Sequence, residues 1–503
     1  MTRLGFLLDS DSCIGCHACT VACKAEHDVP LGVNRTWVKY IETGAFPNTA
    51  RHFSVMRCNH CDDAPCITIC PTGALFRAAN GVVDFDDANC IGCKACMNAC
   101  PYDAIYMNPE THTAHKCNFC NHRLEVGLEP SCVIVCPTQA IKVGDLDDPM
   151  SEVSRIIARD DVAVRAPEQG TRPKVYYRGA DQASLDPLRT AIPADGLIWA
   201  DTTEHHPTLP ASADVVARTT YTTAHPITWA AKVAAYLVTK AVAAGALLVA
   251  ALLVVMGHAS EQAAVGVVPP IVAGVFLAAT GVLLVADLKQ PRRFAYLLTR
   301  PNTRSWLVRG AWILAAYAVA AAAWWVGGVL GAAGWLQVVA APAALLAAAT
   351  AGYTAFLFGQ CEGRDLWQTP LLLPMLLAQA VTAGGAVFAV MDVVMDVPSP
   401  TAVRWALLGG VLATAGLLAL ELTARGTRHV ELAVDAMTRG PYAGQLWVGG
   451  VLVGLALPAV LTIVALAADT GPALPAIASM AAVFGMFALE DVFVRAGQSV
   501  PLS

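Results

Sequence analysis

Eight runs of apolar residues occupy the second half of this chain and restrict it to one kind of architecture. They lie at roughly 229–256, 264–286, 307–331, 336–359, 369–391, 404–424, 446–468 and 474–494. Each run is close to the ~20 residues that a helix needs to cross a bilayer. Since the hydrocarbon core offers no water to satisfy backbone groups, such runs must form helices. With 56% hydrophobic and only 14% charged residues, most of the chain is predicted to be an all-α eight-helix transmembrane bundle.

The loops between these runs divide sharply by charge. Basic residues follow the even-numbered spans: Lys289, Arg292, Arg293, Arg300 and Arg304 after the second, Arg364 after the fourth, and Arg425, Arg428 and Arg439 after the sixth. The alternate loops, at 257–263, 332–335, 392–403 and 469–473, contain no Lys or Arg. Cytoplasmic loops carry the excess of Lys and Arg. We therefore expect a multi-pass protein of a prokaryotic cytoplasmic (inner) membrane, with its N-terminal part and its C-terminus facing the cytoplasm.

The N-terminal part is distinguished by cysteine, because all but one of the 17 cysteines lie between positions 13 and 136. They form four sets of four: Cys13, Cys16, Cys19 and Cys23; Cys58, Cys61, Cys66 and Cys70; Cys90, Cys93, Cys96 and Cys100; and Cys117, Cys120, Cys132 and Cys136. The first and third sets match the bacterial ferredoxin spacing C-x2-C-x2-C-x3-C. In a reducing cytoplasm, disulfides are not expected.

Structural zinc is the alternative to iron and sulfur in these sets. Zinc sites usually show two separated CxxC pairs, whereas here three cysteines follow one another at spacings of three. The endings CPTGAL, CPYDAI and CPTQAI also repeat after the second, third and fourth sets, as expected for duplicated units. Four complete sets predict four 4Fe-4S clusters in an α+β ferredoxin-like domain. The formal net charge of -6 gives no support to a nucleic-acid partner.

Residues 1–180 resemble the four-cluster electron-transfer subunit of the dimethyl sulfoxide reductase, polysulfide reductase and formate dehydrogenase complexes. The resemblance includes the cysteine sets, GDLDDPMSEVSRII and the closing RPKVYYRG. It implies that the sets ligate clusters crosswise. The implied groups are Cys13, Cys16 and Cys19 with Cys136; Cys117, Cys120 and Cys132 with Cys23; Cys58, Cys61 and Cys66 with Cys100; and Cys90, Cys93 and Cys96 with Cys70. The first group would face a catalytic subunit and the last would face the membrane.

Residues 227–495 resemble the eight-helix membrane subunit of polysulfide reductase, the NrfD-like proteins, after a linker at 181–226. The matching stretches are DLKQPRRFAYLLTRP, GRDLWQTPLLLP and GPYAGQLWVGGVLVGLALP. The resemblance implies a bound quinone (menaquinone or ubiquinone) on the side where the iron-sulfur domain docks, and no molybdenum site on this chain. A b-type haem needs axial ligands within the spans. Because His225, His258 and His429 lie at span ends or in loops, we expect no haem.

Four polar residues near the cytoplasmic ends of the spans are candidates for the quinone site. Lys232, Tyr236 and Lys240 recur at spacing four and so share one helical face; Asp287 ends the second span. Polar side chains in a span are costly and usually functional. The alternative is that the lysines extend to the lipid headgroups while Tyr236 anchors the interface. For Asp287 the alternative is a salt bridge to Arg292 or Arg293.

Three further acidic residues lie near the cytoplasmic ends of the sixth and eighth spans. For Glu421, Glu490 and Asp491, we expect ion pairing with Arg425 or Arg495, and a proton path is the second interpretation. The remaining cysteine, Cys361, has no partner set and is expected to be a small buried residue.

Together these features predict the electron-transfer and membrane-anchor subunit of an oxidoreductase complex. A partner subunit with a molybdopterin cofactor would carry out the substrate chemistry, and this chain would connect it to quinone. The substrate alternatives are formate oxidation or the reduction of polysulfide, thiosulfate or dimethyl sulfoxide. Two other functions stay open: a membrane subunit that translocates protons during redox turnover, and an anchor without a quinone site.

Overall fold

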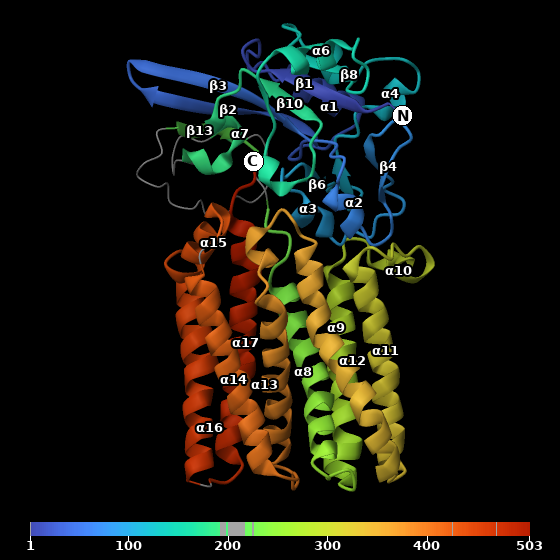
Figure 1. Cartoon of the computed structure of the whole chain (residues 1–503), viewed down its shortest axis with the longest axis vertical. Coiled ribbons are helices and arrows are strands. Elements are labelled where there is room, and N and C mark those ends of the chain that lie inside the picture. Colours follow the sequence, from blue (N-terminus) through green and yellow to red (C-terminus); the bar gives the residue numbers. More distant parts are fainter. Residues whose placement is uncertain (1, 192–197, 200–216, 224–225, 425, 469) are drawn as a thin grey trace.

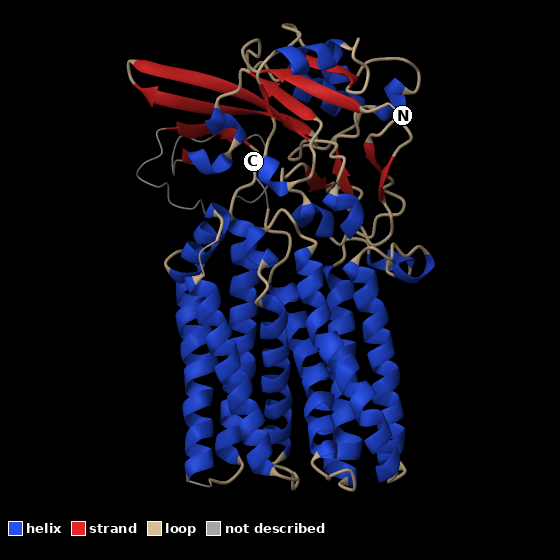
Figure 2. Ribbon diagram, in the orientation of Figure 1, coloured by secondary structure: helices blue, strands red, loops and turns tan. Residues whose placement is uncertain are grey.

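The computed structural model describes residues 2–191, 198–199, 217–223, 226–424, 426–468 and 470–503. It consists of a strand-containing N-terminal part above a bundle of long helices (Figure 1). All strands lie in the upper part (Figure 2). The C-terminus returns to the junction between the two parts (Figure 1), so both halves of the chain contribute to it.

One sheet joins the two ends of the cysteine-rich sequence. Its strand order is β8 (Ile141–Asp145), β1 (Leu4–Asp9), β10 (Val175–Arg178) and β9 (Val162–Ala163), with β1 parallel to β10 and antiparallel to β8. Phe6 is fully buried and stacks on Phe119 with ring centroids 4.0 Å apart. The strand before the first cysteine set is thus fixed to the loop of the fourth.

A second sheet forms an arm that projects from the molecule (Figure 1). Its order is β11 (Thr190–Ala191), β13 (Ala217–Thr222), β2 (Thr36–Ala45) and β3 (Asn48–Arg57), and β12 (Ile198–Trp199) also pairs with β13. Strands β11, β12 and β13 belong to residues 181–226, the predicted linker. In its described residues, this segment is therefore hydrogen-bonded into the sheet of the N-terminal part.

The cysteine sets lie on loops and short helices between these sheets. The helices are α1 (Ala18–Glu26), α2 (Pro65–Ile69), α3 (Ala95–Ala99), α4 (Asn121–Leu124) and α5 (Ser131–Ile134); the pairs β4 (Leu75–Arg77) with β5 (Val83–Phe85) and β6 (Ile105–Met107) with β7 (Ala114–Lys116) flank the second and third sets. The repeat extends to the backbone. Gly15 and Gly92 both have φ +69°, and His17 and Lys94 have φ 59° and 64°. These left-handed residues wrap each CIGCxAC loop around its thiols.

Helices α6 (Glu152–Arg159) and α7 (Gln182–Leu185) complete the N-terminal part among the described residues. Below it, the described part of the chain contains eight helices that are long and apolar enough to cross a membrane. They are α8 (Ala231–Val255), Gln262–Asp287 including α9 (Val268–Asp287), α11 (Trp306–Val329), α12 (Ala333–Gly359), α13 (Leu372–Met391), α14 (Pro400–Thr423), Gln445–Ala467 including α16 (Leu457–Ala467), and α17 (Ala473–Ser499). The predicted spans are confirmed to within a few residues. Short helices α10 (Tyr296–Thr299) and α15 (Arg428–Thr438) lie at the junction.

Helix α8 is the centre of the bundle, because 78% of the residues in its apolar stretch are buried inside the protein. It packs on α9, α12, α13 and α17. Gly245 of α8 lies against the backbone of Gly384 on α13, where a β-carbon would overlap the Ala380 carbonyl oxygen. Small residues permit such close approach, which gives membrane helices most of their packing energy.

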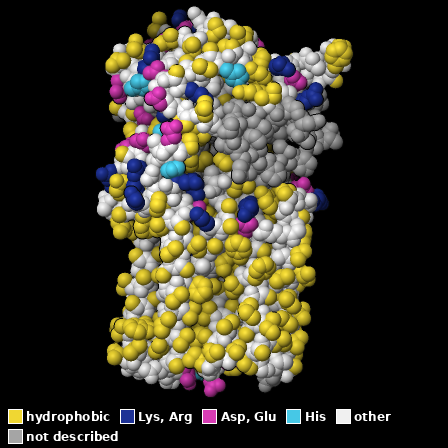
Figure 3. Space-filling view, turned by 180° about the vertical axis from the view of Figure 1, so that it is seen from behind, with side chains coloured by type: hydrophobic (Ala, Val, Ile, Leu, Met, Phe, Trp, Pro, Cys, Tyr) yellow, Lys and Arg dark blue, Asp and Glu magenta, His cyan; other side chains and the backbone are white. Residues whose placement is uncertain are grey.

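The two parts are joined mainly through the second and third cysteine sets. Asn302 donates to the Cys70 carbonyl (2.8 Å), Arg293 donates to the Cys90 carbonyl (2.9 Å), and the Trp229 indole donates to the Cys93 carbonyl (3.1 Å). Figure 3 shows an apolar surface over the helices and Lys and Arg side chains gathered at the junction, with Asp and Glu at the opposite end. The loops of the second and third cysteine sets therefore sit directly on the helix bundle.

Candidate functional site

The sixteen cysteines of the four sets form no disulfides with one another. Thiols of different sets lie close enough together to interact electrostatically. Cys13 lies beside Cys136 and Cys16, and Cys23 lies beside Cys117, Cys132 and Cys120. Likewise, Cys66 neighbours Cys58, Cys100 and Cys61, and Cys96 neighbours Cys93, Cys90 and Cys70. The fold thus brings together the first set with the fourth, and the second with the third.

Because these thiols are buried, they lose their protons only with difficulty unless a positive charge lies nearby. Burial first, and then the nearby Cys70 and Cys90, raise the pKa of Cys93 to about 12. Burial and then Cys58 do the same for Cys100, whose pKa rises to about 12. Four thiolates can share such a site only if a bound metal centre neutralises them, because metal binding displaces the protons.

The four cysteines assigned to one cluster by the resemblance meet at one place in the structure. Cys70, Cys90, Cys93 and Cys96 all line one small cavity. Thiolates placed around a shared space are what a 4Fe-4S cluster requires of its ligands.

Donors around the sulfurs extend the site beyond the cysteines. Arg57 is 1% exposed and donates to Cys132 Sγ at 3.3 Å. Backbone N–H groups of Gly92 and Ala114 donate to Cys90 Sγ, each at 3.4 Å. Hydrogen bonds to sulfur tune the reduction potential of a cluster. Sequence reasoning missed Arg57; its signal was an arginine immediately before the second cysteine set.

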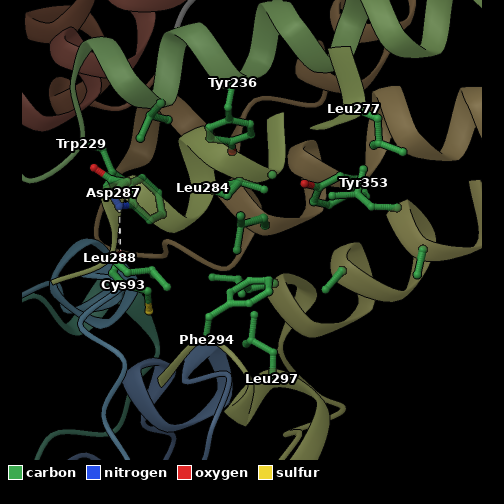
Figure 4. Close-up of a pocket in the computed structure, with 17 residues that line it drawn as sticks. Cys93, Trp229, Tyr236, Leu277, Leu284, Asp287, Leu288, Phe294, Leu297 and Tyr353 are labelled. Atoms are coloured by element: carbon green, nitrogen blue, oxygen red, sulfur yellow. Dashed lines mark hydrogen bonds between the residues drawn. The ribbon is translucent and has the colours of Figure 1, made fainter. Parts of the chain in front are cut away.

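An apolar cavity of about 300 Å³ lies directly beneath the third cysteine set. Its walls come from α8, α9, α11, α12, the α10 region and the cysteine loop; the lining includes Cys93, Trp229, Tyr236, Asp287, Phe294 and Tyr353. Figure 4 shows Tyr236 and Tyr353 on one side and Cys93 with Phe294 on the other. One chamber therefore touches both the cysteine loop and the membrane helices.

The four candidates for this site are placed differently. Tyr236 and Asp287 line the cavity. Lys240 is 1% exposed and lies behind the two tyrosines, 4.7 Å from the Tyr353 ring centroid and 5.9 Å from that of Tyr236. Its extension to the headgroups is therefore ruled out. Lys232 is exposed and donates to the Ala286 carbonyl at 2.9 Å. This position fits the alternative that Lys232 extends toward the lipid headgroups.

One of the expected ion pairs in this region needs a correction. Asp287 pairs with Lys94 of the third cysteine set at 2.8 Å, not with Arg292 or Arg293, because the cysteine loop docks on the end of α9. Glu421 accepts from the Thr369 hydroxyl at 2.6 Å, and its expected pairing with Arg425 stays a prediction, because Arg425 lies outside the described residues. The pairing of Asp491 with Arg495 (2.9 Å) is confirmed.

Glu490 is 3% exposed and faces Lys240 and Gln379 instead of Arg495. Cys361 is fully buried, as expected. Sequence reasoning missed Trp229, Tyr353 and Cys93 as cavity residues. They come from three distant segments, and an aromatic residue in an apolar run gives no signal that sets it apart from packing.

Comparison with known proteins gives the chain its family. A model described as "Polysulphide reductase, NrfD" matches residues 219–501, more than half of the chain. The chain belongs to the NrfD family. Two models of the 4Fe-4S dicluster domain match residues 12–75 and 49–146. The ferredoxin-like region fused to a transmembrane bundle is thereby confirmed.

Curated relatives match over about a third of this chain. The thiosulfate reductase electron transfer subunit PhsB of Salmonella typhi is 48% identical over 159 residues, 31% of this chain and 82% of that protein. Protein NrfC of Escherichia coli is 44% identical over 177 residues (35% and 79%). The arsenate respiratory reductase iron-sulfur subunit ArrB of a Shewanella species is 36% identical over 225 residues (35% and 95%).

These findings confirm the predicted class of protein. This NrfD-family chain is a multi-pass membrane protein with an iron-sulfur region related to the electron-transfer subunits of reductase complexes. Such subunits work with a catalytic partner.

Proposed function

We propose that this chain carries electrons between a molybdopterin-containing catalytic subunit and quinone in the membrane, through four 4Fe-4S clusters. One observation carries the proposal: Cys93 belongs to a cysteine set and also forms part of the wall of the apolar cavity between the helices. A carrier in that cavity would lie next to the last electron-transfer centre. Electrons would then need no haem to cross between them.

The sixteen cysteines would hold the clusters in the four crosswise groups, where 4Fe-4S centres supply one-electron transfer. The group directly above the cavity consists of Cys90, Cys93 and Cys96, which would bind one cluster together with Cys70. Trp229 fixes this loop through the Cys93 carbonyl. The protein thereby sets the distance between the cysteine loop and the cavity.

The cavity has the character that a quinone headgroup requires. Its lining is mostly apolar, with a few polar groups, as in other small-molecule sites. Tyr236 offers a hydroxyl and Asp287 a carboxylate. On the α9 and α11 walls, Leu277 is half-buried and Ala315 is exposed, so the isoprenoid tail has a path toward lipid.

The reaction at this site is conversion of quinone to quinol or its reverse. Reduction takes up two electrons and two protons, one proton on each carbonyl oxygen, and oxidation releases them. The direction and the substrate depend on the partner subunit. With the iron-sulfur region in the cytoplasm, as the basic loops favour, formate oxidation is the leading substrate class, and reduction of polysulfide, thiosulfate or dimethyl sulfoxide is the alternative.

Filling the cavity tests the proposal in the intact complex. Ala311 lines the cavity and Ala318 of the same helix is exposed outside it. We expect Ala311→Trp to abolish reoxidation of the reduced iron-sulfur absorbance by a soluble quinone, while Ala318→Trp reoxidises normally. Equal reoxidation in both variants would place the quinone site elsewhere. No reoxidation in the unmodified complex would make the chain an anchor without a quinone site.

A further inference from the structure

A buried acid that the electron route does not use lies within the helix bundle, behind the tyrosines that line the cavity. Glu490 of α17 is 3% exposed, and its Oε2 atom has no hydrogen-bond partner among the described residues. Nine residues separate it from the end of α17 at Ser499, a depth of about 13 Å along the helix. An ionisable group held this deep without a full set of partners is costly and is usually retained for function.

Lys240 lies at the matching depth on α8, nine residues after the helix begins at Ala231. It lies close enough to Glu490 for the two groups to interact electrostatically, but the two do not form a direct salt bridge among those found in the described part of the chain. The Lys240 ammonium donates instead to the hydroxyl of Thr354. The Lys240 side chain therefore connects the acid to Thr354 of α12.

Thr354 connects this pair to the cavity. The hydroxyl groups of Tyr236 and Tyr353 both interact with Thr354, and both tyrosines line the cavity. The sequence of polar groups is thus Glu490, Lys240, Thr354 and then Tyr236 or Tyr353. In this series, the helices α8, α12 and α17 each contribute a group that can gain or lose a proton or pass one on.

We propose that Glu490 and Lys240 form an internal proton-carrying pair that serves quinone chemistry in the cavity. The inference rests on the proposed quinone site. When quinone is reduced, two electrons arrive one at a time from the iron-sulfur region. Tyr236 donates its proton to one carbonyl oxygen, and a proton passes from the Lys240–Glu490 pair through Thr354 to restore the tyrosine. The other carbonyl oxygen takes the second proton from water on the side of the iron-sulfur region, and the pair takes up one proton from water before the next turnover. During quinol oxidation the same proton moves in the opposite direction and is taken up by the pair.

The other acids nearby have partners of their own. Asp491 pairs with Arg495 (2.9 Å) and accepts from Gln445 (3.0 Å), Asp287 pairs with Lys94 (2.8 Å), and Glu421 accepts from Thr369 (2.6 Å). The groups that face Glu490 are Lys240, Gln379 and the Tyr236 phenol. Gln379 does not titrate, so protonation at this point is shared between Glu490, Lys240 and the tyrosine.

The test compares two buried acids in the membrane-embedded complex with its catalytic partner. Glu490→Gln removes the proton-carrying carboxyl with little change in shape, and Glu490→Asp retains it. Glu421→Gln is the matched control, because it is the same substitution at a buried acid outside the series. A positioned proton donor contributes roughly 100-fold or more to a rate.

We expect Glu490→Gln to slow quinone-linked turnover by 10-fold or more, with turnover by an artificial dye unchanged. Its pH–rate profile should lose one ionisation, and Glu490→Asp should restore part of the rate. Glu421→Gln should behave as the unmodified complex. If Glu490→Gln binds a quinone-analogue inhibitor tightly and keeps an unchanged rate and pH profile, the proton-carrying pair alone is overturned. If the unmodified complex does not bind the inhibitor, the quinone site itself is overturned.

Discussion

At the scale of single residues, Tyr236 gives the most direct test of the cavity. Replacing it with Phe removes one hydroxyl and keeps the ring. If that hydroxyl bonds the quinone, Tyr236→Phe should cost about 1–3 kcal/mol of binding, seen as a rise in the quinone concentration needed for half-maximal turnover. Tyr317→Phe is the control, because Tyr317 donates to the Ala243 carbonyl and does not line the cavity. Equal kinetics in the two variants would remove Tyr236 from the site.

Lys39 makes a second residue-scale prediction, on stability. It is 2% exposed in β2, and burial, with Arg165 nearby, lowers its pKa to about 7. The unfolded chain keeps a lysine charged up to about pH 10.4, so between those values the unfolded state binds more protons and the free energy of unfolding rises with pH. Lys39→Met should stabilise the N-terminal part by about 1–3 kcal/mol and flatten this rise.

Thermal denaturation of the full chain followed between pH 6.5 and 9 checks this prediction. The unmodified protein should gain stability across the range and the variant should gain less. An unchanged slope in Lys39→Met would mean that another group sets the pH dependence.

Sequence alone predicted part of the residue-scale picture. Spacing placed Lys232, Tyr236 and Lys240 on one face, and Tyr236 does line the cavity. It did not reveal that Lys240 lies behind the tyrosines, because burial on a central helix depends on neighbours from α12 and α17. The Lys94–Asp287 ion pair also escaped prediction, because it joins two parts of the chain nearly two hundred residues apart.

At the scale of helices, the crossing of α8 and α13 sets the shape of the bundle. A β-carbon at Gly245 would overlap the backbone of α13, whereas one at Gly274 on α9 would meet nothing within 4 Å. We expect Gly245→Val to reduce the amount of folded protein recovered from membranes several-fold, since overpacking commonly costs 1–3 kcal/mol. Gly274→Val should accumulate normally. Comparable yields would show that α13 shifts aside.

Elements differ in how well sequence predicts them, and the reason is the range of their contacts. The eight helices satisfy their own backbone groups and follow from composition alone. Strand β13 pairs with β2, and Thr219 lies opposite Ile41. These strands are far apart in the sequence, so no local pattern predicts that they pair. Residues 181–226 have the proline-rich, polar character of a linker, yet β13 lies in this segment.

For the whole molecule, the four cysteine groups predict metal content. Complete groups should yield about 16 iron and 16 acid-labile sulfide per chain in anaerobically purified complex. The crosswise pairing adds a sharper expectation, because Cys70→Ser should damage the group of Cys90, Cys93 and Cys96, not the rest of its own set. Stoichiometric zinc with half the iron or less would contradict the four-cluster arrangement.

The last prediction concerns which side of the membrane the iron-sulfur region occupies. The iron-sulfur region and the C-terminus lie at one end of the bundle (Figure 1), so both must be on the same side of the membrane. Lys and Arg gather at that end, and on the face shown in Figure 3 the opposite end of the bundle carries a few Asp and Glu side chains but no visible Lys or Arg. Since positively charged loops are retained in the cytoplasm, a reporter fused after Ser503 should be active only there. A reporter inserted between Met395 and Pro400 should be active only outside. The reverse pair of results would move the catalytic partner and its substrate out of the cytoplasm, and formate oxidation inside the cell would lose its support.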